Sequence, residues 1–243
     1  MFSREPVDIE MESLLLRAYQ RMYRAFGHQH WWPAESALEV CVGAILTQNT
    51  SWTNVELALC NLRHHQALDL AVLHSLEPKQ LANLIRSAGY HNVKARRLKA
   101  FTSLIIETFD GQLELLFQEE GARARALLLG VNGIGPETAD CILLYACSIP
   151  SFVVDTYTKR IFFRHSWINE RASYDEVKQL CEESLSDSIG PHENRLEYWQ
   201  DYHAQIVRIG KEFCRPKNPR CEACPLNELL PESGVKLSRS LSV

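Results

Sequence analysis

The spacing of apolar and polar positions predicts helices along most of the chain. Near the N-terminus, apolar residues recur every three or four positions, as on one face of an amphipathic helix. They are Ile9, Leu14, Leu15, Ala18, Met22 and Ala25. Similar spacing predicts further helices over 35–46, 52–63, 79–87, 94–107, 123–129, 136–147, 156–164, 174–186 and 194–213. Strand patterns are weak throughout, so the sequence predicts an all-α protein of about ten helices.

Length and composition fit an ordinary globular protein. A chain of 243 residues with 46% hydrophobic residues can bury a large core, as one domain or as two smaller lobes. The longest apolar runs, such as 40–46 and 141–147, fall far short of the ~20 residues of a membrane-spanning helix. The first dozen residues are acidic and lack the pattern of a secretory signal. We therefore expect a cytoplasmic protein, associated with the nucleoid if bacterial, and no membrane partner.

Net charge and cysteine content narrow the range of possible functions only slightly. A net charge of −4 gives no indication of nucleic-acid binding, so any such site must be a local cluster. In an intracellular chain we expect the eight cysteines to stay reduced and form no disulfides. Five sit singly in apolar or helical surroundings, where we expect buried thiols: Cys41, Cys60, Cys141, Cys147 and Cys181. The other three cluster near the C-terminus.

A glycine turn joins two predicted helices. Gly133 and Gly135 flank Ile134, and Pro136 suits the first turn of the following helix because its missing N–H costs nothing there. Such a turn can direct backbone N–H groups and a helix N-terminus towards an anion such as a DNA phosphate. A tight interhelical turn explains the same residues. About twenty residues later, Asp155 stands at the start of another predicted helix.

Four ordered segments together resemble the endonuclease III family of helix-hairpin-helix DNA glycosylases. They are 46–50 (LTQNT), 89–95 (GYHNVKA), 133–139 (GIGPETA) and 153–156 (VVDT), and the similarity extends from about residue 30 to about residue 225. The resemblance implies a six-helix barrel over 29–149 that contains the hairpin. It implies a second, discontinuous helical lobe over 1–28 and 150–243, with damaged double-stranded DNA bound across the cleft. We expect a monomer.

In this family an aspartate stabilises the positive charge that builds on the sugar, or positions water, as the base departs. Asp155 matches that residue, and it also suits a helix N-cap. Relatives that nick the strand carry a lysine two residues after the second hairpin glycine, whose amine forms a Schiff base. Glu137 stands there, so we expect base excision without lyase activity. Lys94, Lys159 and Lys211 are the only nearby amines the sequence offers, and surface or phosphate contact suits each better.

Tryptophans near the expected pocket resemble the branch of the family that removes 3-methyladenine. Trp31, Trp32, Pro33 and Trp52 match its aromatic pocket, although core filling is the commoner role of such residues. Electron-rich indoles attract a positively charged alkylated purine by about 0.5–2 kcal/mol each. Glu137 would add attraction if it faces the pocket, although a solvent position near the helix start suits it equally. Lys211 is counted among the pocket residues.

Reaching a base in a duplex requires flipping it out and filling the gap. Gln48 and Tyr90 match the family's glutamine and wedge positions, although a loop polar residue and a half-buried turn aromatic explain them equally. A basic stretch beside Tyr90 comprises Arg86, His91, Lys94, Arg96, Arg97 and Lys99. It suits phosphate docking or a solvated helix face. The predicted DNA contacts are Gln48, Tyr90, Lys94, Gly133, Ile134, Gly135 and Thr138.

The C-terminal cysteines resemble three of the four ligands of the family's iron–sulfur loop. Cys214, Cys221 and Cys224 have the ligand spacing, but Leu230 stands where a fourth cysteine is expected. A [4Fe–4S] cluster is favoured if Asn227, Glu228, Glu232 or solvent takes the fourth iron. Zinc, or thiols with no metal, are the alternatives.

The leading interpretation is a monofunctional DNA glycosylase for cationic alkylated purines. The first alternative keeps the enzyme class but changes the lesion to oxidised or mispaired bases. The second is a helix-hairpin-helix module that binds DNA without catalysis.

Overall fold

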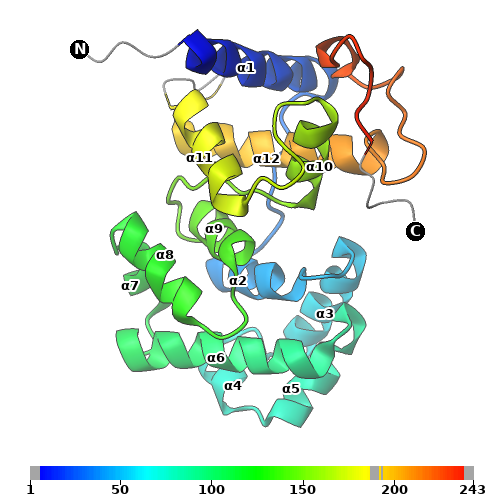
Figure 1. The fold of residues 1–243 in the computed structure, drawn as a ribbon. Coiled ribbons are helices and arrows are strands. Elements are labelled where there is room, and N and C mark those ends of the chain that lie inside the picture. Colours follow the sequence, from blue (N-terminus) through cyan, green and yellow to red (C-terminus); the bar gives the residue numbers. More distant parts are fainter. Residues whose placement is uncertain (1–5, 187–191, 193, 238–243) are drawn as a thin grey trace. The chain divides into compact units, whose positions relative to one another are not determined.

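The chain is all-helical in the part that the structure, a computed structural model, describes: residues 6–186, 192 and 194–237. Side chains of residues 6–10, 12 and 13 are outside that description. Twelve α-helices and two short 3₁₀ helices make up all of its regular elements (Figure 1). The predicted all-α fold is confirmed. The chain divides into two compact units. The first comprises residues 1–31 and 151–243, and the second comprises residues 32–150.

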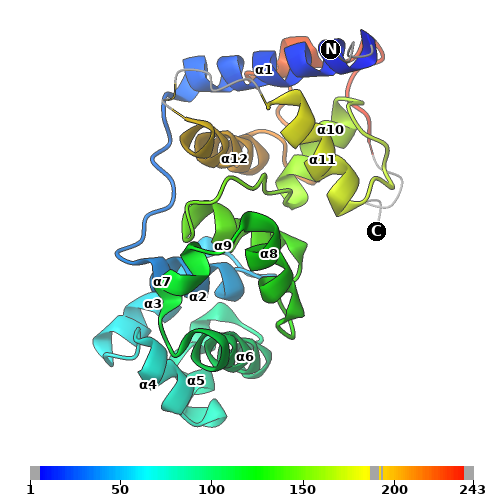
Figure 2. The ribbon, with the colours of Figure 1, turned by 90° about the vertical axis from the view of Figure 1, so that its left-hand side faces the viewer.

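The first unit is built from both ends of the chain. Its helices are α1 (Pro6–Phe26), α10 (Thr156–Arg164), α11 (Tyr174–Ser184), α12 (Arg195–Glu212) and the 3₁₀ helix η2 (Asn227–Leu229). Helix α12 runs beside α1, as Figures 1 and 2 show, and it also packs against α10. Buried aromatic rings fill the core: Tyr19 lies edge-on to Tyr198 at 4.6 Å and stacks on Tyr202 at 5.3 Å. This core fixes α12, which carries several side chains of interest.

The second unit is a continuous helical segment. Its helices are α2 (Ala37–Leu46), α3 (Trp52–His64), α4 (Leu70–Ser75), α5 (Pro78–Leu84), η1 (Arg86–Ala88), α6 (His91–Phe109), α7 (Leu113–Phe117), α8 (Gly121–Gly130) and α9 (Pro136–Tyr145). Residues 39–46 of α2 and 138–144 of α9 are all buried, and the two helices pack together. A helix that is apolar on every side belongs in a core. The loops that leave α2 and enter α9 are therefore fixed by buried neighbours.

Two of the helices were not predicted from the spacing of apolar residues. Helices α4 and α7 are six and five residues long, too short to repeat a 3.6-residue period. Asp69 caps α4 by accepting from the backbone N–H of Val72, a signal that could have located it. Nowhere in the described ranges is a helix both long and apolar enough to cross a membrane.

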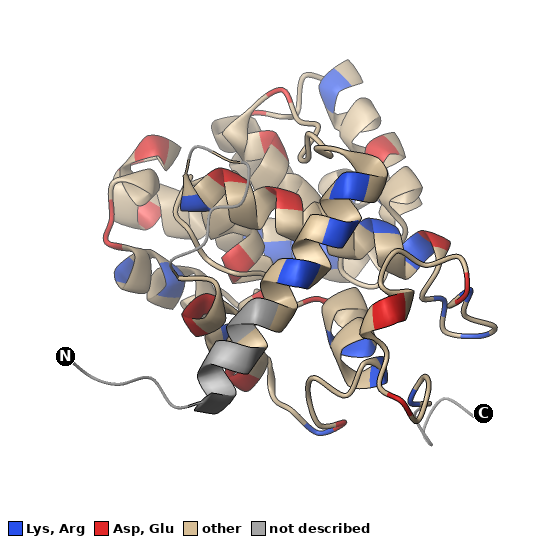
Figure 3. Ribbon diagram, turned by 90° about the horizontal axis from the view of Figure 1, so that it is seen from above, with Lys and Arg blue, Asp and Glu red and all other residues tan. Residues whose placement is uncertain are grey.

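Charge is unevenly distributed along α1. Arg17, Arg21 and Arg24 lie in the C-terminal half of this helix, which carries repeated blue positions in Figure 3. Arg21 pairs with Glu228 of η2, so η2 is tied to α1 on this face. The net negative charge of the whole chain therefore conceals a local basic surface.

Candidate functional site

Asp155 is the N-cap of α10. Its Oδ1 accepts hydrogen bonds from the backbone N–H of Thr158, at 2.7 Å, and from the Thr158 hydroxyl, at 2.8 Å. The residue is 7% exposed, so the carboxylate is largely shielded from solvent. The N-cap expected from the sequence is confirmed. The helix dipole and these two donors place partial positive charge beside one oxygen of the carboxylate.

His203 of α12 faces the other oxygen of this carboxylate. Its Nε2 lies 3.8 Å from Asp155 Oδ2. Burial lowers the pKa of His203, and the neighbouring Asp155 only partly opposes that shift, so the imidazole is neutral at pH 7. His203 was not predicted from the sequence. The only signal that could have suggested it is its place on the buried side of an amphipathic helix.

The place of α10 against α12 depends on a glycine. The ring of Tyr157 occupies the space beside Gly210, where an added Cβ would lie 2.2 Å from ring atom Cδ1. Arg160 donates from Nε to the carbonyl of Cys214 at 2.7 Å and from Nη2 to that of Gly210 at 3.1 Å. Asp155 is therefore positioned by close packing of its own helix. Near the end of α12, the ammonium of Lys211 lies 5.7 Å from the ring centre of Trp31.

The glycine turn in the second unit has the expected form. Gly133 has φ of +90°, a conformation that side-chain-bearing residues rarely adopt, and Arg97 fills the space where its Cβ would project. Gly135 is the N-cap of α9, and Pro136 follows at its first turn. Ile134 is 5% exposed, and its N–H donates to the carbonyl of Val131 at 3.0 Å. The Ile134 N–H thus does not face outward as the sequence suggested, so the first-turn N–H groups of α9 are the better candidate anion donors.

Gln48 joins this turn to the loop after α2. Its Nε2 donates to the carbonyl of Gly133 at 3.0 Å and to the hydroxyl of Thr138 at 2.8 Å. Its Oε1 accepts from Arg97. Thr138 is 6% exposed, so its hydroxyl serves mainly to hold Gln48. Three predicted residues are thus brought together. Arg97 links them, whereas the sequence suggested phosphate docking or a solvated helix face for it.

Part of the basic stretch serves the fold instead of the surface. Lys94 is 1% exposed, and its Nζ donates to the carbonyls of Leu46, at 2.8 Å, and Ala88, at 2.7 Å. The prediction that Lys94 contacts phosphate is therefore wrong, since its ammonium is enclosed and already used. Burial lowers the pKa of Lys94 to about 8, and the nearby Arg97 adds to the shift. Lys99 similarly donates to two carbonyls around the end of α4.

Tyr90 lies at the entrance to α6 with its side chain in the open. It is 72% exposed, far more than the half-buried turn aromatic that the sequence also allowed. Its φ of +46° places it in the left-handed region, next to Gly89 at +68°. The neighbouring Arg86 and Arg96 are exposed as well, so they keep the phosphate role proposed for the stretch. Lys94 anchors this turn through Ala88, two residues before Tyr90.

An aromatic group surrounds Gly43 of α2. Trp32 meets Trp52 edge-to-face at 5.0 Å and lies 5.4 Å from Tyr145, the last residue of α9. A Cβ on Gly43 would lie 3.2 Å from Trp32 and 3.7 Å from Trp52, so the glycine lets the indoles approach the helix. All three rings are half-buried. Tyr145 was not predicted, and its place at the end of a buried helix is the signal that could have identified it.

The other predicted pocket residues are more exposed. Trp31 and Trp32 lie in the loop between α1 and α2. Trp31 belongs to the first unit and Trp32 to the second, by the division of the chain. Pro33 and Glu137 are exposed, and Glu137 is in the first turn of α9. An exposed Glu137 matches the solvent position that the sequence analysis allowed for it.

Cys214, Cys221 and Cys224 line one cavity of the first unit. The cavity has an empty volume of about 310 Å³, part of it open to solvent, and Arg164 and Leu230 also line it. Arg164 donates to Sγ of Cys214 at 3.3 Å. Burial raises the pKa of Cys224 to about 11 and raises that of Cys221. Metal binding at these two thiols would therefore release protons.

The donor set suits a three-thiolate cluster. Leu230 lines the cavity with a side chain that cannot bind iron, so the fourth position needs another donor. Asn227 lines the cavity too, whereas Glu228 pairs with Arg21 of α1, and Glu232 is exposed outside the lining. Among the named alternatives, Asn227 is the protein donor that the geometry favours. Cys60, expected to be buried, is instead exposed on α3.

Comparison with known sequences and structures gives a consistent result. A sequence model of the HhH-GPD superfamily of base excision DNA repair proteins matches residues 42–187. A model of the iron–sulfur binding domain of endonuclease III matches residues 214–229. A Methanocaldococcus jannaschii protein described as a DNA repair glycosylase is 45% identical over 216 residues, which cover 88% of this chain and 94% of that protein.

Solved structures share the fold. The H. pylori 3-methyladenine DNA glycosylase MagIII, bound to 1,N6-ethenoadenine, is 30% identical with a TM-score of 0.70, covering 83% of this chain and 97% of its own. A non-covalent endonuclease III–DNA complex has a TM-score of 0.75 at 22% identity, over 91% of this chain and 95% of the other. At that identity the second match bears on the fold alone.

Proposed function

Because the chain belongs to the HhH-GPD superfamily of base excision DNA repair proteins, we propose that it is a monofunctional glycosylase for cationic alkylated purines. The proposal rests chiefly on the aromatic group of Trp32, Trp52 and Tyr145. Each ring can attract a positively charged base by about 0.5–2 kcal/mol, which a neutral base would not gain. Similarity to a 3-methyladenine glycosylase, at 30% identity, supports the same substrate class.

Asp155 supplies the chemistry in this proposal. Departure of the base leaves positive charge on the sugar, and an adjacent carboxylate stabilises that charge or orients water. Oδ1 is held by Thr158, whereas Oδ2 faces the neutral His203 at 3.8 Å. A neutral imidazole leaves the negative charge of the carboxylate uncompensated. Oδ2 is thus the oxygen best suited to act.

The reaction should end with an abasic site. Glu137 occupies the position of the lyase lysine, and a carboxylate cannot form a Schiff base. Lys94, one of the substitutes considered, is enclosed and bonded to two carbonyls. Lys159 donates to the carbonyl of Ala172 at 3.0 Å, and Lys211 lies over Trp31. Each amine therefore has a structural role that competes with nucleophilic attack.

We assign DNA binding to two features of the second unit, the glycine turn of residues 133–135 and the wedge residue Tyr90. The N-terminus of α9 would hold a phosphate, with Gly133 and Gly135 shaping the turn. Gln48 and the exposed Tyr90 would fill the gap left by a flipped base. Arg86 and Arg96 would add salt-sensitive contacts to the backbone.

We infer that Cys214, Cys221 and Cys224 hold an iron–sulfur cluster. Bound there, the cluster would supply a rigid cross-link for the C-terminal loop. Arg164 orders the same loop through the carbonyls of Arg215 and Pro216, with Nη2 2.9 Å from the latter. The exposed Arg215, Lys217 and Arg220 would then face DNA on an ordered loop.

One experiment tests the substrate proposal. Purified protein is incubated with methylated duplex DNA, and the released bases are identified by mass spectrometry, with strand breaks measured before and after alkali. We expect free 3-methyladenine or 7-methylguanine, and breaks only after alkali. Release of oxidised or mispaired bases from a lesion panel, with none from methylated DNA, would contradict the substrate claim. No release from any duplex would favour a non-catalytic binding module.

A further inference from the structure

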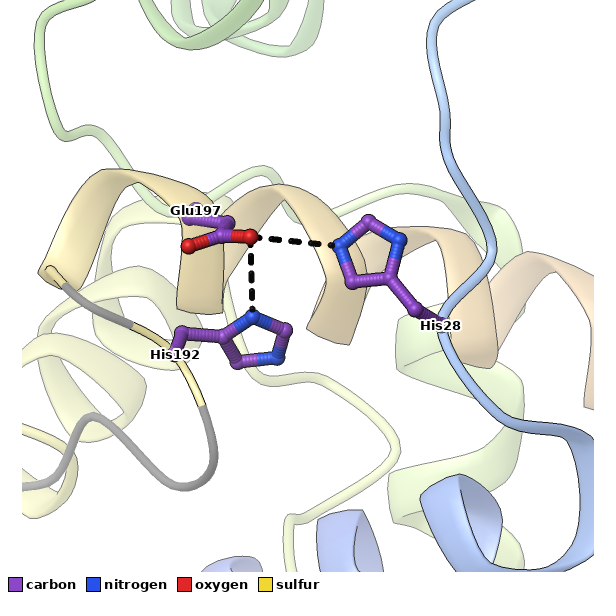
Figure 4. Close-up of side chains that lie close together, drawn as sticks. All are labelled: His28, His192 and Glu197. Carbon is purple, nitrogen blue, oxygen red and sulfur yellow. Dashed lines mark ion pairs between the residues drawn. The ribbon is translucent and has the colours of Figure 1, made fainter.

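Two histidines and a glutamate converge in the first unit from separate parts of the chain. His28 follows α1, His192 precedes α12, and Glu197 lies in the first turn of α12 (Figure 4). One nitrogen or oxygen atom from each lies within 4.8 Å of those of the others. We propose that His28, His192 and Glu197 bind a divalent transition-metal ion such as zinc. The site is separate from the three cysteines and does not rest on the proposed function.

The spacing matches ligands around a shared ion. Oε1 of Glu197 lies 3.7 Å from Nε2 of His28 and 3.5 Å from Nδ1 of His192. Ligands about 2.0–2.2 Å from a tetrahedral zinc ion lie about 3.3–3.6 Å from one another. A direct N–H···O hydrogen bond is shorter, at about 2.7–3.2 Å. The two distances from Glu197 are therefore close to those between ligands and too long for hydrogen bonds, and the two imidazole nitrogens lie within 4.8 Å of each other.

The orientation of His192 is set by buried neighbours. Tyr19 donates its single hydroxyl proton to Oδ2 of Asp201 at 2.6 Å, and the same hydroxyl contacts Nε2 of His192. Nε2 is therefore the donor in that contact, and in the neutral imidazole this leaves the Nδ1 lone pair facing Glu197. Metal-binding histidines typically have their second nitrogen held in this way. The His192 side chain is 2% exposed, so this orientation is well fixed.

His28 presents the second nitrogen. Its Nε2 is buried and has no hydrogen-bond partner within the described part of the chain. Its Nδ1 accepts from the backbone N–H of His30 at 2.9 Å. A metal on Nε2 would require a proton on Nδ1, so this contact would break. The N–H of the exposed His30 can then turn to water, which gives metal binding a distinct signature.

Metal binding here would fasten the segment after α1 to α12. Asp201 of α12 already accepts from the backbone N–H of Gln29 at 2.7 Å, and Gln205 donates to the carbonyl of Gly27 at 2.7 Å. His28 lies between these two anchors, and Trp31 follows three residues later. Two imidazoles and one carboxylate suit zinc, cobalt or nickel, with remaining positions filled by water.

The test uses cobalt as a spectroscopic probe on the full-length protein. Co²⁺ is added to the protein as isolated, after dialysis against a mild chelator, and visible and near-ultraviolet spectra are recorded. We expect one cobalt ion bound with visible d–d bands and without a thiolate-to-cobalt charge-transfer band. Nitrogen-15 NMR of the protein loaded with diamagnetic Zn²⁺ in place of Co²⁺ should show the proton of His28 moving to Nδ1. Absence of these bands at saturating cobalt would overturn the proposal.

Variants assign the ligands. His28→Asn, His192→Asn and Glu197→Gln should each abolish these bands, whereas His64→Asn, in an exposed histidine pair at the end of α3, should leave them unchanged. Tyr19→Phe removes the partner of His192 but no ligand, so affinity should fall about 10- to 100-fold. Circular dichroism identifies any variant that fails to fold. The ligand assignment is then judged from the variants that do fold. Unchanged binding in folded His28→Asn and Glu197→Gln would refute the assignment.

Discussion

Oδ2 of Asp155 lies 3.8 Å from Nε2 of His203, while Oδ1 is held by the backbone and hydroxyl of Thr158. The two carboxylate oxygens therefore have different environments. One caps a helix, and the other faces an imidazole that burial keeps neutral at pH 7. Structural and chemical roles of this side chain can consequently be separated by mutation.

Asp155→Asn should remove base release while preserving the fold. Asparagine caps helices about as well as aspartate, so the free energy of unfolding should change little. The charge is lost, and the rate should fall at least about 100-fold. Single-turnover release from methylated DNA measures the rate, and fluorescence anisotropy measures binding, which should persist. Asp155→Ala is the contrasting variant, since it also loses about 1 kcal/mol of capping. Full activity in Asp155→Asn would remove this carboxylate from the mechanism.

Glu137 should determine the absence of lyase activity. Borohydride should trap no covalent complex between the wild-type protein and abasic DNA, because no amine occupies the family's lysine position. Glu137→Lys should form a trapped complex visible by gel electrophoresis. Glu137→Gln, which adds no amine, is the control and should remain untrapped. Efficient trapping of the wild-type protein would show that another lysine acts.

Tyr90 should contribute to binding but little to stability. Stacking of an aromatic ring on a base is worth about 1–3 kcal/mol, so Tyr90→Asn should weaken binding to duplex DNA containing an abasic analogue at least about fivefold. Asparagine tolerates the left-handed backbone, and the side chain is 72% exposed, so stability should change by at most about 0.5 kcal/mol. Leu57→Asn replaces another exposed apolar residue in the same unit and should bind normally. Equal affinities for the two variants would exclude a wedge role.

Lys94 should make stability depend on pH in alkaline solution. Its pKa is about 8 in the folded protein and near 10.5 when unfolded. Between these values the unfolded state binds more protons, so the free energy of unfolding should rise with pH. Subtracting the values for Lys94→Met removes the contribution of other groups. Urea unfolding from pH 7.5 to 10 measures this difference. A difference that stays constant or falls would mean that the pKa is not lowered.

Three cysteines should account for bound iron. Protein purified without oxygen should contain iron and acid-labile sulfide, and Cys221→Ser should lose both. Cys60→Ser, which removes the exposed cysteine of α3, should keep the wild-type content. Bound zinc without sulfide would support the three-thiolate zinc alternative. Neither metal in anaerobic protein would leave the thiols with a packing role.

The sequence predicted the helical class and the family because both depend on local patterns. Apolar spacing fixes a helix, and Gly133 and Gly135 are required by the turn that they form. What it missed depends on tertiary contacts. The sequence suggests that Lys94 is a surface cation, whereas in the structure its ammonium is buried and bonded to the carbonyls of Leu46 and Ala88. His203 and Tyr145 likewise gain meaning only from neighbours distant in sequence. Short helices such as α4 offer too few turns for a period to emerge.

The packing of Tyr157 on Gly210 limits how this protein can evolve or be redesigned. Even alanine at position 210 would collide with the ring, so α10 would have to move away from α12. Asp155, the N-cap of α10, would move with it. Substitutions at the aromatic group of Trp32, Trp52 and Tyr145 meet no such constraint from α10. The absence of a single side-chain carbon at position 210 therefore limits which changes in the first unit leave the carboxylate where it is.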